Sequence, residues 1–380
     1  MTPKNTSTSA MLERMKNVSR FLDRAFPMPR LLAPPTVGID ISDASIKWLS
    51  IEEKRGERRV RTYGEYPLSA GLVESGVIKN VAALAEALES VRKEQGGITA
   101  VHACLPEEPA YVFSMYVPSG TPREQVQRMI EFEFEGRVPI PPTASVYDYN
   151  RIGIVEAGSE EIAVSVLPRE VVDAYIEAFD SSGFTLLSLE VEARSVGRAI
   201  SLSRATDPVT LVIDVGRGRT GFAVLKHGIP IFTSTVDVGG DSIMHALMEK
   251  VGLSEEAAET YKNDIGLLTP PNKNTKELEA VSGAAATIAD EVVRHYHYWD
   301  TRRNEEGNRM SPVERVVLVG GNANLKGLTD YISGRIQARA ERANVWQNVA
   351  TFEEYIPPIA KQKSLQYATA VGLALREFAL

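Results

Sequence analysis

Cysteine is almost absent from the 380-residue chain, which contains only Cys104. A single cysteine excludes an internal disulfide framework and a zinc site built from cysteines, and it fits a reducing compartment. Long hydrophobic runs are missing as well. The longest, such as 209–215 and 316–319, have the length of a strand and fall far short of the roughly 20 residues that cross a bilayer. The sequence therefore predicts no membrane-spanning segment.

The N-terminus lacks the uninterrupted apolar stretch of a secretory signal, because Arg14, Lys16, Arg20 and Arg24 separate its hydrophobic residues. We therefore expect the chain to remain in the cytoplasm. Positive charge is also scarce: the formal net charge is -8, and the main body shows no cluster of Lys and Arg that would hold a nucleic-acid backbone. With 43% hydrophobic and 24% charged residues, the composition is typical of a soluble globular protein, long enough for two domains.

Residues 1–35 differ from the rest of the chain. Residues 1–9 are small and polar, which predicts disorder, and apolar residues between 11 and 26 fall on one helical face. Basic residues predominate in this arm, whereas the remainder is acidic, and prolines at 27, 29, 34 and 35 predict an extended tether. Two interpretations stay open: an amphipathic arm that lies on an anionic membrane or in a partner's groove, or a helix that packs on its own domain.

Two segments of the body repeat one pattern of strand, polar turn, strand, turn and strand. The first covers 36–68 and the second 209–238. In each, an aspartate lies inside an apolar strand immediately before a turn of small residues: Asp40 in GIDIS and Asp214 in VIDVG. Two such units at the starts of two α/β halves indicate an internal duplication.

Between the two repeats the sequence predicts a helix at 80–95, a strand at 98–105 and a smaller α+β unit. That unit comprises strands at 111–118, 144–154, 161–168 and 184–190, and helices at 122–135 and 169–182.

The two aspartates need partners, because a carboxylate at the end of a hydrophobic strand is costly to desolvate unless it is paired or faces a cation. If the two halves face one another, both carboxylates point into one cleft, where a hydrated Mg²⁺ that bridges to phosphate oxygens would satisfy them. The adjacent turns offer backbone N–H groups and hydroxyls that can cradle phosphates. These residues are Ser42, Asp43, Ala44, Ser45 and Lys47 on the first side, and Gly216, Arg217, Gly218, Arg219 and Thr220 on the second. Either motif alone is equally compatible with an ordinary hairpin that contains a structural aspartate.

Two Gly-Gly pairs extend the predicted site. One ends a buried strand at 315–319 and leads into a helix, and the other opens a helix directly after the second repeat. Glycine lets the backbone approach a ligand closely and leaves helix N–H groups free. The residues assigned here are Gly239, Gly240, Asp241, Gly320, Gly321, Asn322 and Leu325.

Glu259 and Lys262 stand three residues apart and share a helical face. They could hold a ribose or base, although a solvated ion pair is the commoner reason for such spacing. The five histidines are scattered along the chain and predict no metal site.

The order of two Asp-containing turns followed by strand, Gly-Gly and helix resembles the actin, heat-shock chaperone and sugar kinase superfamily. More closely, residues 36–380 resemble the PilM family of type IV pilus assembly, relatives of the division protein FtsA. The matching stretches include GIDISDASIK at 38–47, LEVEARSV at 189–196, DVGRGRTGFAVLKHG at 214–228, DVGGDSI at 237–243, GLSEEAAETYK at 252–262 and VLVGGNANLKGL at 317–328.

The resemblance implies an α/β fold of the actin-like (ribonuclease H-like) type: a two-lobed ATPase with an inserted 1C-type α+β subdomain. It implies subdomain 1A at 36–110 and 186–206, 1C at 111–185, 2A at 207–241 and 313–380, and 2B at 242–312. It also implies ATP with Mg²⁺ as the ligand, with Asp40 and Asp214 on the metal side. The implied partner is the cytoplasmic tail of a PilN-like inner-membrane protein. The chain would then be peripheral at the inner membrane and link that partner to the pilus motor.

In polymerising members of this superfamily, a glutamate at the helix entry between the two phosphate units orients the attacking water. Glu192 matches that position, with Glu190 nearby. Water positioning supplies only part of a hydrolytic rate. We therefore expect ATP binding with slow or absent hydrolysis; a surface or capping carboxylate is the alternative for Glu192.

Two other functions stay open. A division protein like FtsA would carry its amphipathic membrane helix at the C-terminus, whereas here residues 363–380 continue the fold. A phosphotransferase of the sugar kinase type would need a catalytic aspartate aimed at a substrate hydroxyl and a sugar pocket. The PilM-like insertion at 111–185 counts against this second function.

Overall fold

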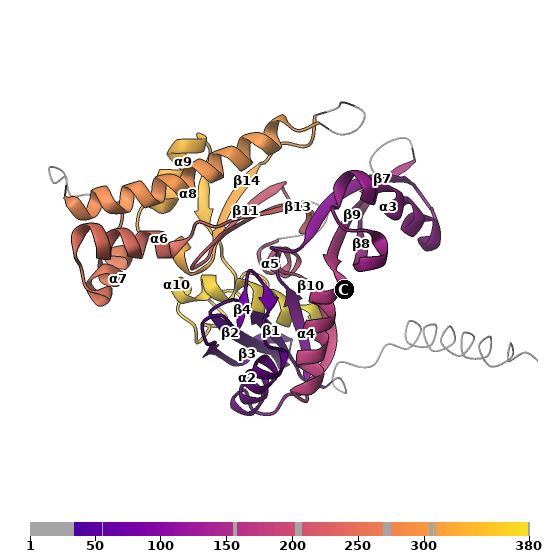
Figure 1. Ribbon diagram of the computed structural model, residues 1–380, viewed down its shortest axis with the longest axis horizontal. Coiled ribbons are helices and arrows are strands. Elements are labelled where there is room, and N and C mark those ends of the chain that lie inside the picture. Colours follow the sequence, from indigo (N-terminus) through magenta and orange to yellow (C-terminus); the bar gives the residue numbers. More distant parts are fainter. Residues whose placement is uncertain are drawn as a thin grey trace, which may run out of the picture. The chain divides into compact units, whose positions relative to one another are not determined.

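The computed structural model describes residues 34–54, 56–154, 158–201, 207–268, 275–303, 307 and 309–378. The chain divides into two compact units, residues 1–35 and 36–380. The predicted disordered stretch and amphipathic helix of the arm lie outside the described residues. The elements labelled in Figure 1 belong to the unit 36–380.

A five-stranded mixed sheet forms the centre of the first lobe, in the order β10-β6-β1-β2-β3. β1 pairs antiparallel with β2 and parallel with β6, and β10 is parallel to β6. All residues of β1 are buried, as expected for a central strand that is covered on both faces. The strands are β1 (Thr36–Ile41), β2 (Ser45–Lys54), β3 (Glu57–Pro67), β6 (Ala100–Leu105) and β10 (Thr185–Val191).

The sheet of the second lobe repeats this arrangement in the order β13-β12-β11-β14-β15. β11 takes the place of β1, since it is antiparallel to β12 and parallel to β14. The α/β fold class is thereby confirmed, and the equal strand order and polarity are what an internal duplication produces. The strands are β11 (Thr210–Val215), β12 (Thr220–Lys226), β13 (Ile229–Val236), β14 (Arg315–Val319) and β15 (Ala340–Arg342).

A three-stranded antiparallel sheet, in the order β7-β9-β8, forms a unit inserted in the first lobe. It has a core of its own, in which Ile130 and Phe134 of α3 pack against the strands. Figure 1 shows this unit beside β13, and Lys226 of the second lobe donates to Glu161 of β9 at 2.6 Å. The elements are β7 (Tyr111–Pro118), α3 (Arg123–Arg137), η2 (Pro142–Ala144), β8 (Ser145–Ile154) and β9 (Ser159–Pro168).

Helix α4 (Arg169–Ser181) packs mainly on α2 (Val81–Glu94) and also touches the edge of the inserted sheet at β8 and β9. Its residues Tyr175 and Phe179 are buried in the core of the first lobe. The separate core of the inserted unit therefore lies within 111–168, whereas the inserted subdomain expected from the sequence runs to residue 185.

Helices and short turns surround the second sheet. Ser254 and Thr275 cap the first turns of α7 and α8, because their hydroxyl oxygens accept bonds from backbone N–H groups three residues on. Within the described residues, no helix is long and apolar enough to cross a membrane. The elements are α6 (Gly240–His245), the π-helical turn η3 (Ala246–Val251), α7 (Glu255–Asp264), α8 (Lys276–Thr301), η4 (Gly321–Asn324) and α9 (Leu328–Ile336).

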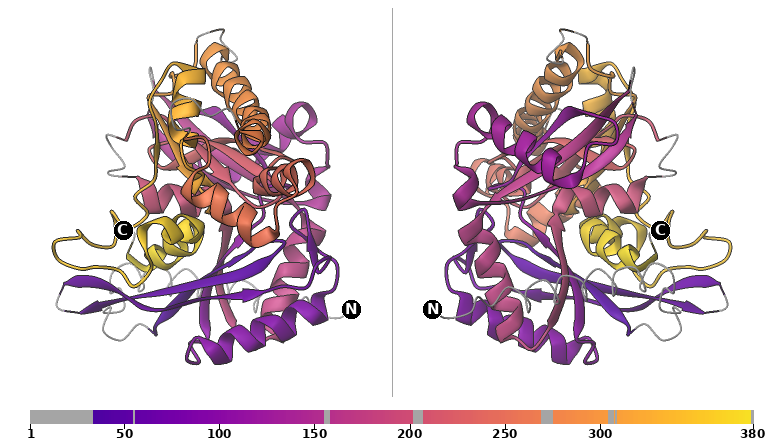
Figure 2. Two further views of the ribbon diagram at one scale, coloured as in Figure 1. Left: turned by 90° about the vertical axis from the view of Figure 1, so that its left-hand side faces the viewer. Right: turned by 90° about the vertical axis from the view of Figure 1, so that its right-hand side faces the viewer.

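Two helices, α5 (Glu192–Ile200) and α11 (Ala368–Ala374), lie between the two sheets. Figure 2 shows the C-terminal segment, in yellow, between the strands of the first lobe and those of the second. The two helix backbones touch, so that a Cβ at Gly372 would overlap the carbonyl oxygen of Ser195. The remaining elements are β4 (Val73–Glu74), β5 (Val77–Ile78), α10 (Lys361–Ser364), η5 (Leu365–Tyr367) and η6 (Leu375–Phe378).

We expect Gly372→Ala to destabilise the protein by about 2 kcal/mol or more, because the new methyl group has to push α5 and α11 apart. Gly334→Ala is the matched control: Gly334 also lies in a helix, α9, but a Cβ there meets no atom within 4 Å. The control should be neutral or stabilising by up to about 1 kcal/mol. Urea unfolding measures both changes, and equal stability of the two variants would show that the α5–α11 contact does not constrain the fold.

Candidate functional site

A cavity of about 1620 Å³ lies between the two lobes. The β1–β2 turn forms one wall and the β11–β12 turn forms the opposite one, with parts of α5, α7, η4 and η5 around them. Acidic side chains outnumber basic ones among the residues that line it. The cavity lies at the carboxyl ends of β1 and β11, where α/β sheets commonly bind ligands.

Asp40 and Asp214 occupy equivalent places near the ends of β1 and β11, and both line this cavity. Burial raises the pKa of Asp40, although Lys47 and the Cys104 thiol, which donates to Asp40 Oδ1 at 3.3 Å, act in the opposite direction. Burial and then the charge of Asp40 raise the pKa of Asp214 to about 7. Two desolvated like charges disfavour each other's ionised form, and a cation between them would favour it. The structure thus brings together the two residues predicted for the metal side.

The β1–β2 turn is held by its own polar groups. Ser42 N donates to Ser45 O at 2.9 Å, and Ser45 N donates to Ser42 Oγ at 3.2 Å. Lys47 donates to Ser45 Oγ at 2.8 Å, and its Nζ lies 3.4 Å from Glu65 Oε1. Lys47 is therefore fixed at the cavity wall, where its charge can balance an anionic ligand.

The β11–β12 turn rests on the pair Gly239 and Gly240. Gly216 N donates to Arg219 O at 2.9 Å across the turn, and Gly240 N donates to Gly216 O at 3.0 Å. Gly239 lies beneath the turn, where a Cβ would come within 2.5 Å of both Arg217 O and Arg219 N. Any side chain at 239 would therefore displace the turn from the cavity wall.

In the other pair, Gly320 and Gly321, Gly320 lies directly against Asp214. Gly320 has a φ of +87°, and a Cβ there would overlap Asp214 Oδ1 and lie 2.6 Å from Val215 O. Only glycine allows this approach and this backbone conformation. Next to it, Asn322 donates to Gly216 O at 2.9 Å and accepts from Lys262 Nζ at 3.3 Å. Asn322 therefore links the β11–β12 turn to α7.

Most residues predicted for ligand binding line the cavity, but three do not. Thr220 is fully buried and donates to Val238 O at 2.6 Å, Gly239 lies behind the turn, and Leu325 is in the hydrophobic core. We therefore place these three behind the wall and not in it. The predicted residues in the wall are Ser42, Asp43, Ala44, Ser45, Lys47, Gly216, Arg217, Gly218, Arg219, Gly240, Asp241, Glu259, Lys262, Gly320, Gly321 and Asn322.

Glu192 also lines the cavity, at the first turn of α5. Burial, followed by the charges of Asp40 and Asp214, raises its pKa well above the usual range. Its Oε1 accepts a hydrogen bond from Thr369 Oγ1 at 3.1 Å. Glu190 points elsewhere: it forms a bidentate ion pair with Arg198, at 2.6 and 2.8 Å.

Sequence reasoning missed Glu107 and Glu108, which follow β6 and line the same cavity. Glu107 accepts from Ala193 N at 3.2 Å, at the start of α5, and burial raises the pKa of Glu107 to about 7. A signal was available: the strand at 98–105 is buried and ends in two glutamates between prolines. Parallel pairing of β6 with β1 places this end beside Asp40.

The carboxylates do not form a closed metal cage. Across the parts of the chain that the structure describes, no group of three or more His, Cys, Asp or Glu side chains is arranged to hold a metal ion. An ion at Asp40 and Asp214 would therefore complete its coordination with water or ligand oxygens.

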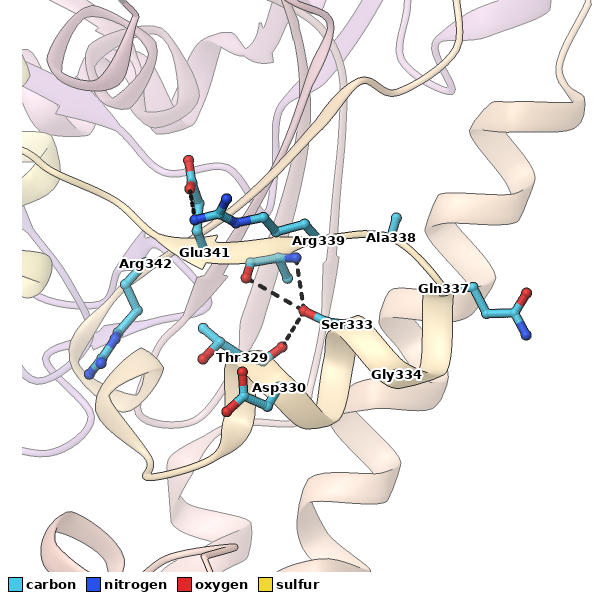
Figure 3. A pocket seen from close by; sticks show the side chains of 10 residues that line it. Thr329, Asp330, Ser333, Gly334, Gln337, Ala338, Arg339, Glu341 and Arg342 are labelled. Carbon is cyan, nitrogen blue, oxygen red and sulfur yellow. Dashed lines mark hydrogen bonds and ion pairs between the residues drawn. The ribbon is translucent and has the colours of Figure 1, made fainter.

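A second pocket, of about 680 Å³, lies between α9 and β15 (Figure 3). Its central hydroxyl already has partners: Ser333 donates to Thr329 O at 2.6 Å and accepts from Ala340 N at 2.9 Å. Figure 3 shows Gln337 and Arg342 extending away from this centre. None of the predicted site residues lies here, so the cleft between the lobes is the candidate site.

Comparisons with known proteins identify the family and the fold of the chain. The family model described as type IV pilus assembly protein PilM matches residues 38–378. A solved PilM-PilN type IV pilus biogenesis complex has a similar chain, with a TM-score of 0.75, 21% identity, and coverage of 91% of this chain and 99% of that one.

More distant relatives share the fold. MreB5 of Spiroplasma citri has a TM-score of 0.52 at 14% identity, with coverage of 91% of this chain and 97% of that one. The cell division protein FtsA of Streptococcus pneumoniae serotype 2 is 24% identical over 343 residues, which cover 77% of this chain and 72% of FtsA. The actin-like two-lobed fold is thus confirmed, and the match to the family model over residues 38–378 shows that the chain belongs to the PilM family of type IV pilus assembly proteins.

Proposed function

We propose that the cleft binds ATP with Mg²⁺ and that nucleotide occupancy controls the capture of a membrane partner. The observation that carries this proposal is that Asp40 and Asp214 line the same cavity. They lie at equivalent positions in the central strands of two sheets that have the same strand order. MreB5 of Spiroplasma citri, which shares the fold, has been solved with ADP and with AMPPNP, and this supports a nucleotide as the ligand.

The residues present fit a hydrated Mg²⁺. This ion prefers oxygen ligands and keeps several of its waters, so two carboxylates suffice on the protein side. Desolvation raises the pKa values of Asp40 and Asp214 although Lys47 lowers both, and a bound cation would favour their ionised forms. When bound, the ion supplies the charge that lets an acidic cavity accept phosphates.

In this proposal the two turns hold the phosphates and the α7 side holds the nucleoside. Residues 42–45 and 216–218 of these turns line the cavity, and Lys47 adds a fixed positive charge. The nucleoside would lie along Gly320–Asn322, with Glu259 and Lys262 for the ribose or base.

Glu192 is our candidate for positioning the water that attacks the terminal phosphate. Thr369 fixes one of its oxygens, and the other can hold a water. The raised pKa of Glu192 favours its protonated form, which accepts a proton poorly. We therefore propose slow or absent hydrolysis, as suits a nucleotide-controlled scaffold.

The chain is a type IV pilus assembly protein by family. We propose that it captures the cytoplasmic tail of a PilN-like inner-membrane protein and links it to the pilus motor, peripherally at the inner membrane. The similar solved chain belongs to a PilM-PilN complex, which supports this partner. The similarity to FtsA keeps a division protein as the second candidate, with weaker support because its identity is 24% and the family model that matches is that of PilM.

Asp214→Asn should weaken binding of Mg·ATP at least about tenfold, because it removes one of the two charges that hold the ion. Isothermal titration calorimetry measures this, with and without a peptide of the PilN-like tail. Asp148→Asn is the control, since Asp148 is an exposed residue on β8 that pairs with Arg123. Unchanged ATP affinity in Asp214→Asn would refute the assignment of the site.

Glu192→Gln should leave Mg·ATP affinity within about threefold of the wild type and reduce phosphate release by about tenfold or more, where the wild type hydrolyses ATP at all. The isosteric amide keeps an acceptor for Thr369 but cannot act as a base. Single-turnover phosphate release gives the rate. Equal rates in the two proteins would leave Glu192 as a capping carboxylate of α5.

The ligand-free protein should lose stability as the pH rises from about 4 to about 7. Asp214 titrates near 7 when folded and near 4 when unfolded, so in this window the folded state keeps a proton that the unfolded state has released. We expect the melting temperature to fall by a few degrees, and Asp214→Asn to flatten the slope. Because the pKa of Glu107 is also about 7, the stability of Asp214→Asn should still fall with rising pH, but less steeply than that of the wild type. Differential scanning calorimetry at several pH values measures this, and identical slopes would show that Asp214 does not titrate there.

A further inference from the structure

Arg219 connects the two lobes across the mouth of the cleft. It lies in the β11–β12 turn of the second lobe, and its guanidinium group donates to Asp43 and to Glu108 of the first lobe. It also donates to Ser75 Oγ at 3.2 Å, and its Nε lies 3.3 Å from Asp237 of its own lobe. One planar cation thus holds two carboxylates from the opposite side of the cavity.

The two acceptors on the first lobe are themselves fixed. Asp43 accepts from the backbone N–H groups of Ser75 and Gly76, each at 3.2 Å, in the turn between β4 and β5. Gly76 packs so closely on Pro106 that a Cβ would overlap the proline ring, and Glu108 follows two residues later. The receiving side is therefore preorganised, which reduces the entropic cost of binding a guanidinium group.

The contact lies where a ligand phosphate would enter. Arg219, Asp43 and Glu108 all line the cavity, and the side chain of Arg219 is 21% exposed. Arginine binds carboxylates and phosphates through the same bidentate geometry. A phosphate placed between the two turns would compete with Asp43 and Glu108 for this guanidinium and would be repelled by both carboxylates.

We propose that Arg219 is an interlobe latch: it holds the two turns together in the ligand-free protein and exchanges Asp43 and Glu108 for the phosphates of an entering nucleotide. Occupancy of the cleft is thereby converted into release of the first-lobe turn. The identity of the ligand rests on the proposed function, whereas the latch in the ligand-free protein does not.

The latch itself is tested without ligand by hydrogen-exchange mass spectrometry on the full chain. Arg219→Gln should accelerate exchange in peptides that cover 69–79, because Asp43, freed from the guanidinium, no longer holds the Ser75 and Gly76 amides firmly. Arg217→Gln is the control: Arg217 lies in the same turn but is exposed and pairs with Asp241 of its own lobe. Exchange in Arg219→Gln that matches this control would overturn the proposal.

The exchange of partners is tested by comparing Arg219→Gln with Glu108→Gln. Both should loosen the ligand-free turn, but their effects on Mg·ATP affinity should have opposite signs. Arg219→Gln removes a phosphate ligand and should weaken binding about tenfold or more, whereas Glu108→Gln removes a competitor and a repulsive charge and should strengthen it.

A change of the same sign in both variants would mean that Arg219 acts only as a structural ion pair, and it would overturn the exchange. If the wild type binds no nucleotide, the proposed function fails, and hydrogen exchange alone still decides whether the latch exists. Arg219→Lys, which keeps the charge but loses the planar fork, should fall between the wild type and Arg219→Gln in exchange rate.

Discussion

The presence of two aspartate carboxylates, one buried and one half-buried, in the same cavity is the constraint on which the rest of the structure depends. Asp40 and Asp214 stand near the ends of central strands, where desolvation raises the pKa of both and the charge of Asp40 raises that of Asp214 further. Such a pair is tolerated when the surroundings keep it in place and a ligand can bring a cation. Gly320, which has no side chain to displace Asp214, and the α5–α11 contact between the sheets maintain this arrangement.

The same constraint connects the fold to its role in pilus assembly. Each lobe contributes one of the two equivalent aspartates and one turn to the cavity, so a charged ligand there would change the charge between the lobes. Arg219 is the described residue that joins the two turns across this gap, through Asp43 and Glu108. In our proposal this connection is what lets nucleotide binding change the protein, because a ligand shifts a conformational equilibrium only when its two states differ in their contacts.

The fold could be predicted largely from the sequence, because each lobe begins with a local strand-turn-strand pattern whose aspartate has no place in an ordinary core strand. The ligand-facing turns followed from the same pattern, since they are adjacent in sequence to the two aspartates. Glu107 and Glu108 could not be placed in this way, because they reach the cavity through the parallel pairing of β6 with β1. Leu325 and Thr220 were predicted in the wall because they are adjacent in sequence to cavity residues. Both side chains are buried in the protein interior. The packing of α4 on α2 could not be predicted from the sequence either, because an apolar helix face does not identify the element it packs against.

The most direct test of a metal-dependent nucleotide site is calorimetric titration of the wild-type chain with ATP, in the presence of Mg²⁺ and again in excess chelator. We expect one ATP per chain with Mg²⁺ and a loss of affinity of at least about tenfold without it, because the cavity is acidic and Asp40 and Asp214 would be balanced by a cation. No detectable binding with Mg²⁺, or equal affinity in chelator, would contradict the role assigned to Asp40 and Asp214.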